Sequence, residues 1–237
     1  MFHNILNVRY NILKQFENSV NEPFAQTYKE HANALLDIVQ QSGEQLEGNI
    51  FFGHNHKDFD LTKLDKTLKK KRENLALFAL SKSSILEIGF NSGFSTLLML
   101  SANPNLKITS VDAGYHSYVQ PCANYLKKIF GDRFTLVIGD SREVLPIYLC
   151  NNNNFDGYHI DGSHQESIAE TDLCNIINTA RNGSVICFDD ANFPQLRTII
   201  TIYLLQGSVS HIFDPTYLNG NDQMFLKVNK NHEQDNK

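Results

Sequence analysis

The chain has 237 residues, of which 41% are hydrophobic and 20% charged, values that are typical of a globular protein with a packed core. Its formal net charge of −5 argues against general binding to nucleic acids or to an anionic membrane, because both need a basic protein surface. The four cysteines are widely separated, and no apolar run is long enough to cross a bilayer. We therefore expect a cytoplasmic protein with reduced thiols and with neither nucleic-acid nor membrane partners.

Residues 1–83 are predicted to form a helical extension that acts as a lid over the bound ligands. Residues 23–40 place apolar side chains at helical spacing, and a second helix is predicted from about residue 60 to residue 81. The loop between these helices contains His54 and His56, for which an exposed position and a place in a metal site are both open.

From residue 84 the pattern changes to short apolar runs that alternate with helical segments. The runs are SILEIGF, KITSVDA, RFTLVIGD, DGYHIDG and SVICFDD. This alternation predicts a mostly parallel, doubly wound α/β sheet of the Rossmann-like type. Two further runs, SVSHIFD and DQMFLKV, are separated only by a turn-rich stretch, which predicts an antiparallel hairpin at the edge of the sheet. The domain is expected to span residues 84–229, followed by a frayed tail at 230–237.

The turn after the first predicted strand reads LEIGFNSGFST. Gly89 and Gly93 allow a tight turn that a ligand can approach closely, and the following helix offers unpaired N–H groups. The pattern is not the G-x-G-x-x-G of dinucleotide-binding turns. Glu87 would repel a pyrophosphate and attract a cationic ligand, so the turn favours a positively charged ligand. A structural, salt-bridged acid is the alternative interpretation of Glu87.

Polar residues also end the second and third predicted strands. Asp112 follows at about the distance where an acid accepts the ribose hydroxyls of a nucleoside, with a helix cap as the alternative. Asp140 and Ser141 end the third strand, where their polar groups can contact an adenine edge. A nucleoside that carries a positive charge instead of phosphates describes S-adenosylmethionine.

Over residues 84–228 the chain resembles the class I S-adenosylmethionine-dependent methyltransferases, through ILEIGFNSGFS, VDAG, VIGDS, HIDGSH and the closing hairpin. The resemblance implies a seven-stranded sheet whose last strand is antiparallel. It also implies cofactor contacts at eight positions: Glu87, Gly89, Asn91, Gly93, Ser95, Asp112, Asp140 and Ser141.

Carboxylates follow the fourth and fifth predicted strands, which end in Asp161 and in Asp189 and Asp190. Because neighbouring parallel strands end at one edge of a sheet, these carboxylates would raise one another's pKa values unless a cation were present. Oxygen ligands suit Mg²⁺, Ca²⁺ or Mn²⁺. The alternatives are that Asp161 contacts cofactor or substrate directly, and that Asp189 and Asp190 cap the next helix.

This arrangement resembles the divalent-metal-dependent O-methyltransferases of the catechol and macrolide-sugar types. The resemblance implies Asp161, Asp189 and Asp190 as metal ligands, with Asp161 and His164 as the catalytic residues and His164 as general base. For His164, substrate binding and helix capping are the alternatives. The expected reaction is methyl transfer to a hydroxyl group of a small molecule such as a sugar, a phenol or a polyketide.

Two other functions stay open at this stage. An NAD(P)-dependent oxidoreductase has a related fold, but the missing glycine pattern and Glu87 count against it. A non-catalytic adenosine-binding module is the other alternative. A helical extension can also join copies of a chain, so a homo-oligomer is one expectation.

Overall fold

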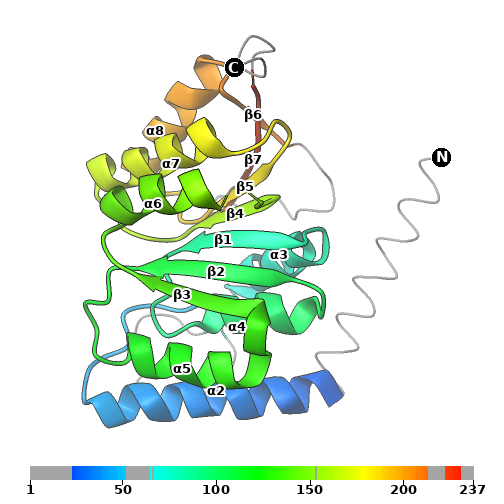
Figure 1. Cartoon of the computed structure of the whole chain (residues 1–237), viewed down its shortest axis with the longest axis vertical. Helices are drawn as coiled ribbons and strands as arrows, with labels where there is room; N and C mark the ends of the chain where they lie inside the picture. The colour runs from blue at the N-terminus through cyan, green and yellow to red at the C-terminus, as the bar shows by residue number, and fades with distance from the viewer. Residues whose placement is uncertain (1–22, 52–64, 66, 153, 213–221, 231–237) are drawn as a thin grey trace, which may run out of the picture.

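The computed structural model describes residues 23–51, 65, 67–152, 154–212 and 222–230. Within this part of the chain, seven strands form one sheet in the order β3-β2-β1-β4-β5-β7-β6 (Figure 1). The strands are β1 (Ser84–Ile88), β2 (Lys107–Asp112), β3 (Phe134–Ile138), β4 (Gly157–Ile160), β5 (Val185–Phe188), β6 (Val209–His211) and β7 (Met224–Val228). The first five are parallel, and β7 runs antiparallel to both β5 and β6. The predicted Rossmann-like sheet with an antiparallel hairpin at its edge is confirmed.

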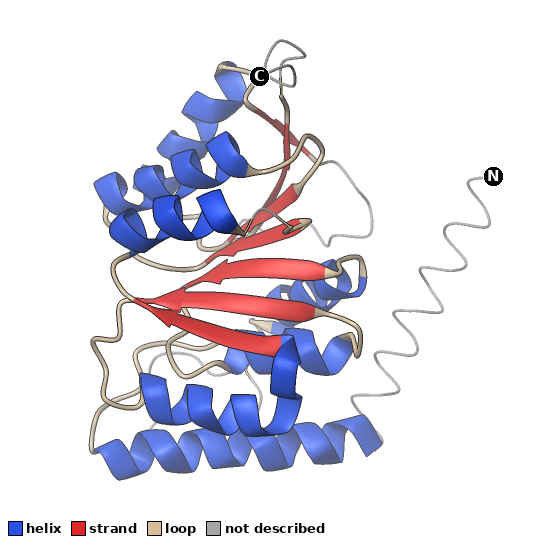
Figure 2. Ribbon diagram, in the orientation of Figure 1, coloured by secondary structure: helices blue, strands red, loops and turns tan. Residues whose placement is uncertain are grey.

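Helices cover both faces of the sheet (Figure 2). One face packs against α2 (Pro23–Ser42), α3 (Lys69–Leu80), α4 (Phe94–Ala102) and α5 (Val119–Phe130). The other face packs against α6 (Ser141–Asn151), α7 (Glu166–Thr179) and α8 (Pro194–Leu205). Ile85 points into the first core and Leu86 into the second, as the alternation of side chains along a strand requires. Residues of β1 that share the parity of Ile85 therefore face the N-terminal helices.

The helical extension packs onto the first core. Ala32, Leu35, Leu36 and Val39 of α2 are buried there, as their helical spacing predicts, and α2 lies against α4 and α5. The extension is therefore an added layer of the domain's own core. None of the described helices combines the length and apolar character that spanning a bilayer would take.

The second predicted helix starts later than its apolar pattern indicates. It begins at Lys69 with Leu68 at its N-cap, and just before it the side chain of Asp65 accepts hydrogen bonds from the backbone N–H (2.8 Å) and hydroxyl (2.6 Å) of Thr67. Residues 52–64, with His54 and His56, lie outside the described part of the chain. At the other end, Lys230 is held in place, since its ammonium donates to the carbonyls of Ile177 and Asn178 in the last turn of α7.

The carboxyl ends of β1 and β4 lie so close that one residue between them has no room for a side chain. Gly89 follows β1 with φ +93°, and a Cβ built on it would lie 2.0 Å from the carbonyl oxygen of Asp161. Replacement by alanine would push two backbones apart at the edge where the predicted site residues lie.

We predict that Gly89→Ala lowers the free energy of unfolding by more than about 3 kcal/mol, since both the backbone conformation and the contact with Asp161 are unfavourable. Gly207→Ala is the matched control. Gly207 has φ +74° with no atom within 4 Å of the added Cβ, so only the backbone term of about 1–2 kcal/mol applies. Urea unfolding of both variants measures the difference, and equal losses would contradict the steric argument.

Candidate functional site

Glu87 of β1 is a fully buried acid whose oxygens are both occupied. It accepts hydrogen bonds from the hydroxyls of Ser95 (2.6 Å), Ser110 (2.6 Å) and Thr96, and one oxygen lies 3.2 Å from His159 Nδ1. Burial alone would raise the pKa of Glu87, but His159 and the hydroxyl donors hold it below its ordinary value. The structure therefore places Glu87 beneath the turn as a paired acid, in line with the alternative interpretation of this residue.

Asp112 joins the glycine-containing turn to the end of β2. Its carboxylate accepts from the backbone N–H groups of Phe90 (2.9 Å) and Asn91 (2.8 Å), and its second oxygen accepts from Gly114 N (2.8 Å). Asn91 adopts φ +53°, and its side-chain oxygen accepts from the hydroxyl of Tyr118 at 2.8 Å. The partly exposed carboxylate of Asp112 thus lies at the strand edge, where ribose binding stays a prediction.

Both packing and backbone conformation require glycine at position 93. It precedes α4 with φ +82°, and a Cβ there would lie 2.6 Å from the ring of Phe90 and 2.8 Å from Leu126. Of the residues predicted around the methionine moiety, Gly89, Asn91 and Gly93 form the turn, whereas Ser95 uses its hydroxyl on Glu87.

Asp140 and Ser141 lie at the start of α6, beside the end of β2. Asp140 caps the helix by accepting from Arg142 N at 3.0 Å, and this arginine lowers the pKa of Asp140 to about 2. Burial raises the pKa of Asp172 on α7 to about 6, although the hydroxyl of Ser141 opposes the shift. A backbone hydrogen bond of 2.8 Å from Gly139 to Asp112 holds this loop next to the turn.

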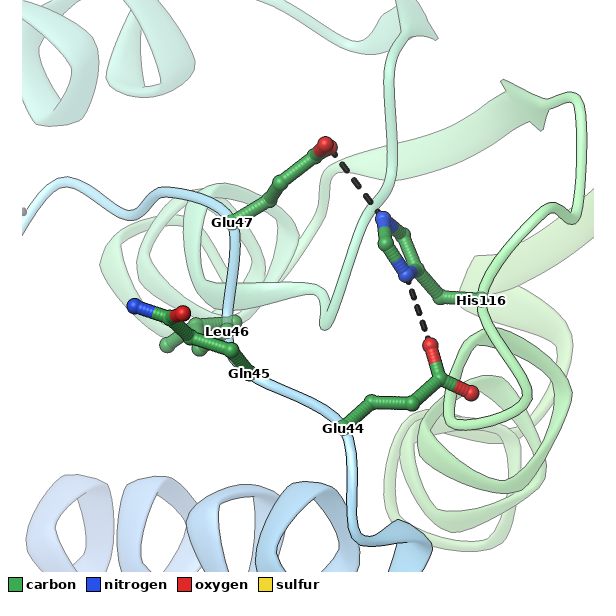
Figure 3. Close-up of a pocket in the computed structure, with 5 residues that line it drawn as sticks. All are labelled: Glu44, Gln45, Leu46, Glu47 and His116. Atoms are coloured by element: carbon green, nitrogen blue, oxygen red, sulfur yellow. Dashed lines mark hydrogen bonds and ion pairs between the residues drawn. The ribbon is translucent and has the colours of Figure 1, made fainter.

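A pocket of about 460 Å³ lies beside these loops, lined by residues 44–47 and His116 (Figure 3). His116 lies between two acids, with Nδ1 2.7 Å from Glu44 and Nε2 3.1 Å from Glu47. Ser117 also donates its backbone N–H (2.9 Å) and its hydroxyl to Glu44. The pocket wall is therefore acidic, which disfavours a pyrophosphate ligand.

The ends of β4 and β5 bring the second set of predicted residues together. A ring nitrogen of His159 and one carboxylate oxygen each of Asp161 and Asp189 lie within 4.8 Å of one another. Burial raises the pKa of Asp161 well above its ordinary value, and the neighbouring Asp189 raises it further. Burial also raises the pKa of Asp189, although Lys71 opposes the shift. Two close acids with raised pKa values are the signature of a place that favours an added positive charge.

Lys71 of α3 reaches across to this edge. Its Nζ lies 3.1 Å from each oxygen of Asp189 and 2.6 Å from Oδ1 of Asp190. Burial lowers the pKa of the ammonium, but the two carboxylates outweigh burial and raise it above the ordinary lysine value. The extension thus contributes a cation to the acidic end of the site.

The carboxylate of Asp190 contacts His164 as well as Lys71. Asp190 has φ +52°, and its Oδ2 lies 2.9 Å from His164 Nε2. The ring of Phe193 packs on the imidazole with a centroid separation of 4.6 Å. Helix α8 starts at Pro194 with Phe193 as N-cap and no side-chain cap, so neither Asp189 nor Asp190 caps it.

The structure therefore brings Asp161, Asp189, Asp190 and His164 to one edge, as the strand ends predict. Two residues of this edge were missing from the predicted set, namely His159 and Lys71. Strand alternation could have indicated His159, since it stands two positions before Asp161 and shares its face. Lys71 gives no such signal, because its contact spans 118 residues of sequence.

The strand order, with an antiparallel β7 beside β5, is typical of the Rossmann-like methyltransferase fold. Residues 86–191 match the family model described as a methyltransferase domain, Methyltransf_24. Residues 86–191 are therefore similar to a methyltransferase domain, within a sheet whose strand order is typical of Rossmann-like methyltransferases. A search of curated protein sequences finds no match.

Solved structures with this fold include several methyltransferases. Cofactor-bound Rv0187 from MTB has a TM-score of 0.62 at 17% identity, covering 92% of this chain and 97% of that one. The O-methyltransferase from Bacillus cereus in complex with S-adenosylhomocysteine has a TM-score of 0.57 at 18% identity, covering 84% and 91%. MycE methyltransferase from the mycinamycin biosynthetic pathway, in complex with Mg and S-adenosylhomocysteine, has a TM-score of 0.51 at 17% identity, covering 84% and 56%. At these identities the likeness establishes the fold.

The Glu44–His116 contact predicts a pH window for the attachment of the extension. Hydrogen bonds from Ser117 and His116 lower the pKa of Glu44 from its ordinary 4.5 to about 2. The stability that ionised Glu44 adds to the folded state is therefore complete above pH 4.5 and is lost as the pH falls towards 2. Burial lowers the pKa of His116, but Glu44 and Glu47 outweigh burial and raise it above the ordinary 6.5. The stability that protonated His116 adds to the folded state is therefore complete below pH 6.5 and is lost as the pH rises through the raised pKa.

We therefore expect the difference in melting temperature between wild type and His116→Gln to be largest near pH 5.5 and smaller at about pH 3 and pH 8.5. Thermal unfolding at the three pH values measures it. A difference that stays constant with pH would show that the imidazole acts by packing alone.

Proposed function

We propose that the protein is an S-adenosylmethionine-dependent O-methyltransferase that methylates a hydroxyl group of a small molecule, with a divalent cation beside the acceptor. The observation that carries the proposal is the His164–Asp190 pair next to Asp161 and Asp189, at the sheet edge that also presents the glycine turn. A proton acceptor and an acidic cation site side by side suit the activation of a hydroxyl group.

The cofactor side is supported by the acidic character of its surroundings. S-adenosylmethionine would supply the methyl group on a positively charged sulfonium, whereas NAD⁺ would bring a pyrophosphate. Glu44 and Glu47 line the pocket and Asp112 holds the turn, so the charges favour the first ligand over the second. Three solved structures with this fold are complexes with S-adenosylhomocysteine.

His164 is placed to act as the general base. Its side chain is 42% exposed, so a substrate hydroxyl can reach it. Asp190 accepts the Nε2 proton at 2.9 Å, which selects the tautomer whose Nδ1 lone pair is free to accept a proton. The ring of Phe193 holds the imidazole plane. We assign Asp190 to this orienting role, since its other oxygen is bound by Lys71.

The residues around Asp161 and Asp189 fit a divalent cation. Their carboxylates are close, partly or fully buried, and raised in pKa, and Oδ1 of Asp189 has an ion-pair contact to Lys71 but no hydrogen bond. A cation held by them would supply positive charge that lowers the pKa of a bound hydroxyl. Asp190, expected from sequence as a third ligand, is engaged elsewhere.

The binding experiment comes first. We expect calorimetric titration with S-adenosylhomocysteine to show one site per chain, and titration with NAD⁺ to give no heat above dilution. Asp112→Ala should weaken binding of the nucleoside at least about tenfold, because it removes the acceptor that holds the turn and is predicted to bind ribose. Binding of NAD⁺ in place of the nucleoside would overturn the proposal.

Sugars, phenols and polyketides are first screened as acceptors with radiolabelled S-adenosylmethionine. The role of His164 as general base is then tested with the acceptor that is found. His164→Gln should lower kcat by about 10²- to 10⁴-fold and leave the affinity for S-adenosylhomocysteine unchanged. His211→Gln on β6 is the matched control, since that histidine lies on the edge strand, and it should keep wild-type kcat. Equal rates for wild type and His164→Gln would remove the base from this proposal.

A further inference from the structure

We propose that His159 is a metal ligand and that the cation site consists of His159, Asp161 and Asp189, a nitrogen-containing set that selects Mn²⁺ or another transition ion over Mg²⁺. The role of this metal site rests on the proposed function. The geometry of the site and its test concern metal binding and do not depend on methyl transfer.

The geometry of His159 leaves one nitrogen available. The residue lies on β4 with an exposed fraction of 0%, and its Nδ1 lies 3.2 Å from Glu87 Oε1. Its Nε2 is buried and has no hydrogen-bond partner among the described residues. A buried, unpaired imidazole nitrogen is unfavourable, and it belongs to a ring within 4.8 Å of the carboxylates of Asp161 and Asp189. A cation among the three would satisfy it.

Glu87 gives this ring the orientation that metal-binding histidines have. Imidazole ligands commonly donate their second N–H to a carboxylate, which sets the tautomer and makes the ligand nitrogen more basic. Glu87 is such a carboxylate, and it is itself held by the hydroxyls of Ser95 and Ser110 at 2.6 Å each. With Nδ1 protonated towards Glu87, the lone pair of Nε2 points away from it.

The donor set predicts the kind of metal. Mg²⁺ and Ca²⁺ favour sites made only of oxygen, whereas a neutral imidazole adds affinity for Mn²⁺, Fe²⁺, Co²⁺ or Zn²⁺. The ligands expected from the sequence were all carboxylates, whereas this site has a nitrogen of His159 in place of an oxygen of Asp190. The site should therefore prefer first-row transition ions to Mg²⁺ and Ca²⁺. Asp190 lies outside the group of three close ligand atoms, and His164 holds one of its oxygens at 2.9 Å.

Lys71 makes cation binding a competition. Its ammonium is 3.1 Å from both oxygens of Asp189, so a metal that uses this carboxylate has to displace it. Asp190, at 2.6 Å from the same ammonium, can keep it nearby after displacement. The N-terminal extension, through α3, is therefore coupled to occupancy of the metal site.

The competing explanation is that His159 is an imidazolium that balances Glu87, Asp161 and Asp189, with protons on both nitrogens. In that case no nitrogen is available to a metal. Electron spin echo envelope modulation of Mn²⁺ bound to the wild-type, full-length protein separates these two explanations. It detects the ¹⁴N of an imidazole ring that coordinates the Mn²⁺ ion.

We expect one Mn²⁺ per chain with ¹⁴N modulation in wild type, and a 100-fold excess of Mg²⁺ should fail to displace it. His159→Gln should lose the modulation and bind Mn²⁺ at least about tenfold more weakly. His164→Gln is the matched control, since it removes the other imidazole near these carboxylates and should keep the modulation. S-adenosylhomocysteine binding by each variant reports folding independently of metal.

A wild-type spectrum without ¹⁴N modulation, or ready displacement of Mn²⁺ by equimolar Mg²⁺, would overturn the inference whether or not the variants fold. Loss of modulation in His164→Gln but not in His159→Gln would also overturn it. Failure of S-adenosylhomocysteine binding with an intact ¹⁴N signal would instead count against the proposed function.

The competition gives a separate prediction. Lys71→Met removes the ammonium but keeps an unbranched side chain, so it should tighten Mn²⁺ binding by about tenfold or more. Lys71→Arg retains the positive charge and should stay within about threefold of wild type. Titrations followed by the free Mn²⁺ signal measure all three proteins, and weaker binding by Lys71→Met would show that the lysine supports the site.

Discussion

The buried carboxylate of Glu87 is the interaction on which the site depends. A charge with no exposure to water is unfavourable unless it is fully paired, and Glu87 is paired by hydroxyls from α4 and β2 and by His159 of β4. These partners come from both neighbours of β1 in the sheet and from the helix that follows it. One side chain therefore joins α4, the helix that follows the glycine-containing turn, to the strand that ends beside the acidic residues.

The proposed reaction divides this edge of the sheet into two halves, one for the cofactor and one for the acceptor. In the proposed function, the glycine turn and Asp112 would bind the cofactor, and Asp161 and Asp189 would lie beside the acceptor. Close approach of Gly89 to Asp161 places the halves in direct backbone contact. Methyl transfer is a displacement along one line, so alignment of the two ligands by a rigid sheet edge is the main contribution the protein can make.

The N-terminal extension touches both halves. Glu44 binds His116 and Ser117 beside the cofactor turn, while Lys71 binds the acids after β5. Because α2 is also part of the main hydrophobic core, the extension helps to build the site as well as to cover it. Occupancy of either half is expected to change how firmly the extension is held.

Much of this protein follows from its sequence. Alternating strands and helices, the glycine turn and acids at the strand ends predict the sheet and the edge that carries the site, because these signals are local and have a short period. The partners of those acids are decided by tertiary structure. Lys71 reaches Asp189 over 118 residues and His159 reaches Glu87 over 72, and only packing of α3 and β4 on their neighbours brings such pairs together. The sequence pattern thus determined that charged residues lie at one edge of the sheet. The tertiary structure decided which of these charges are paired within the chain and which are available to a ligand.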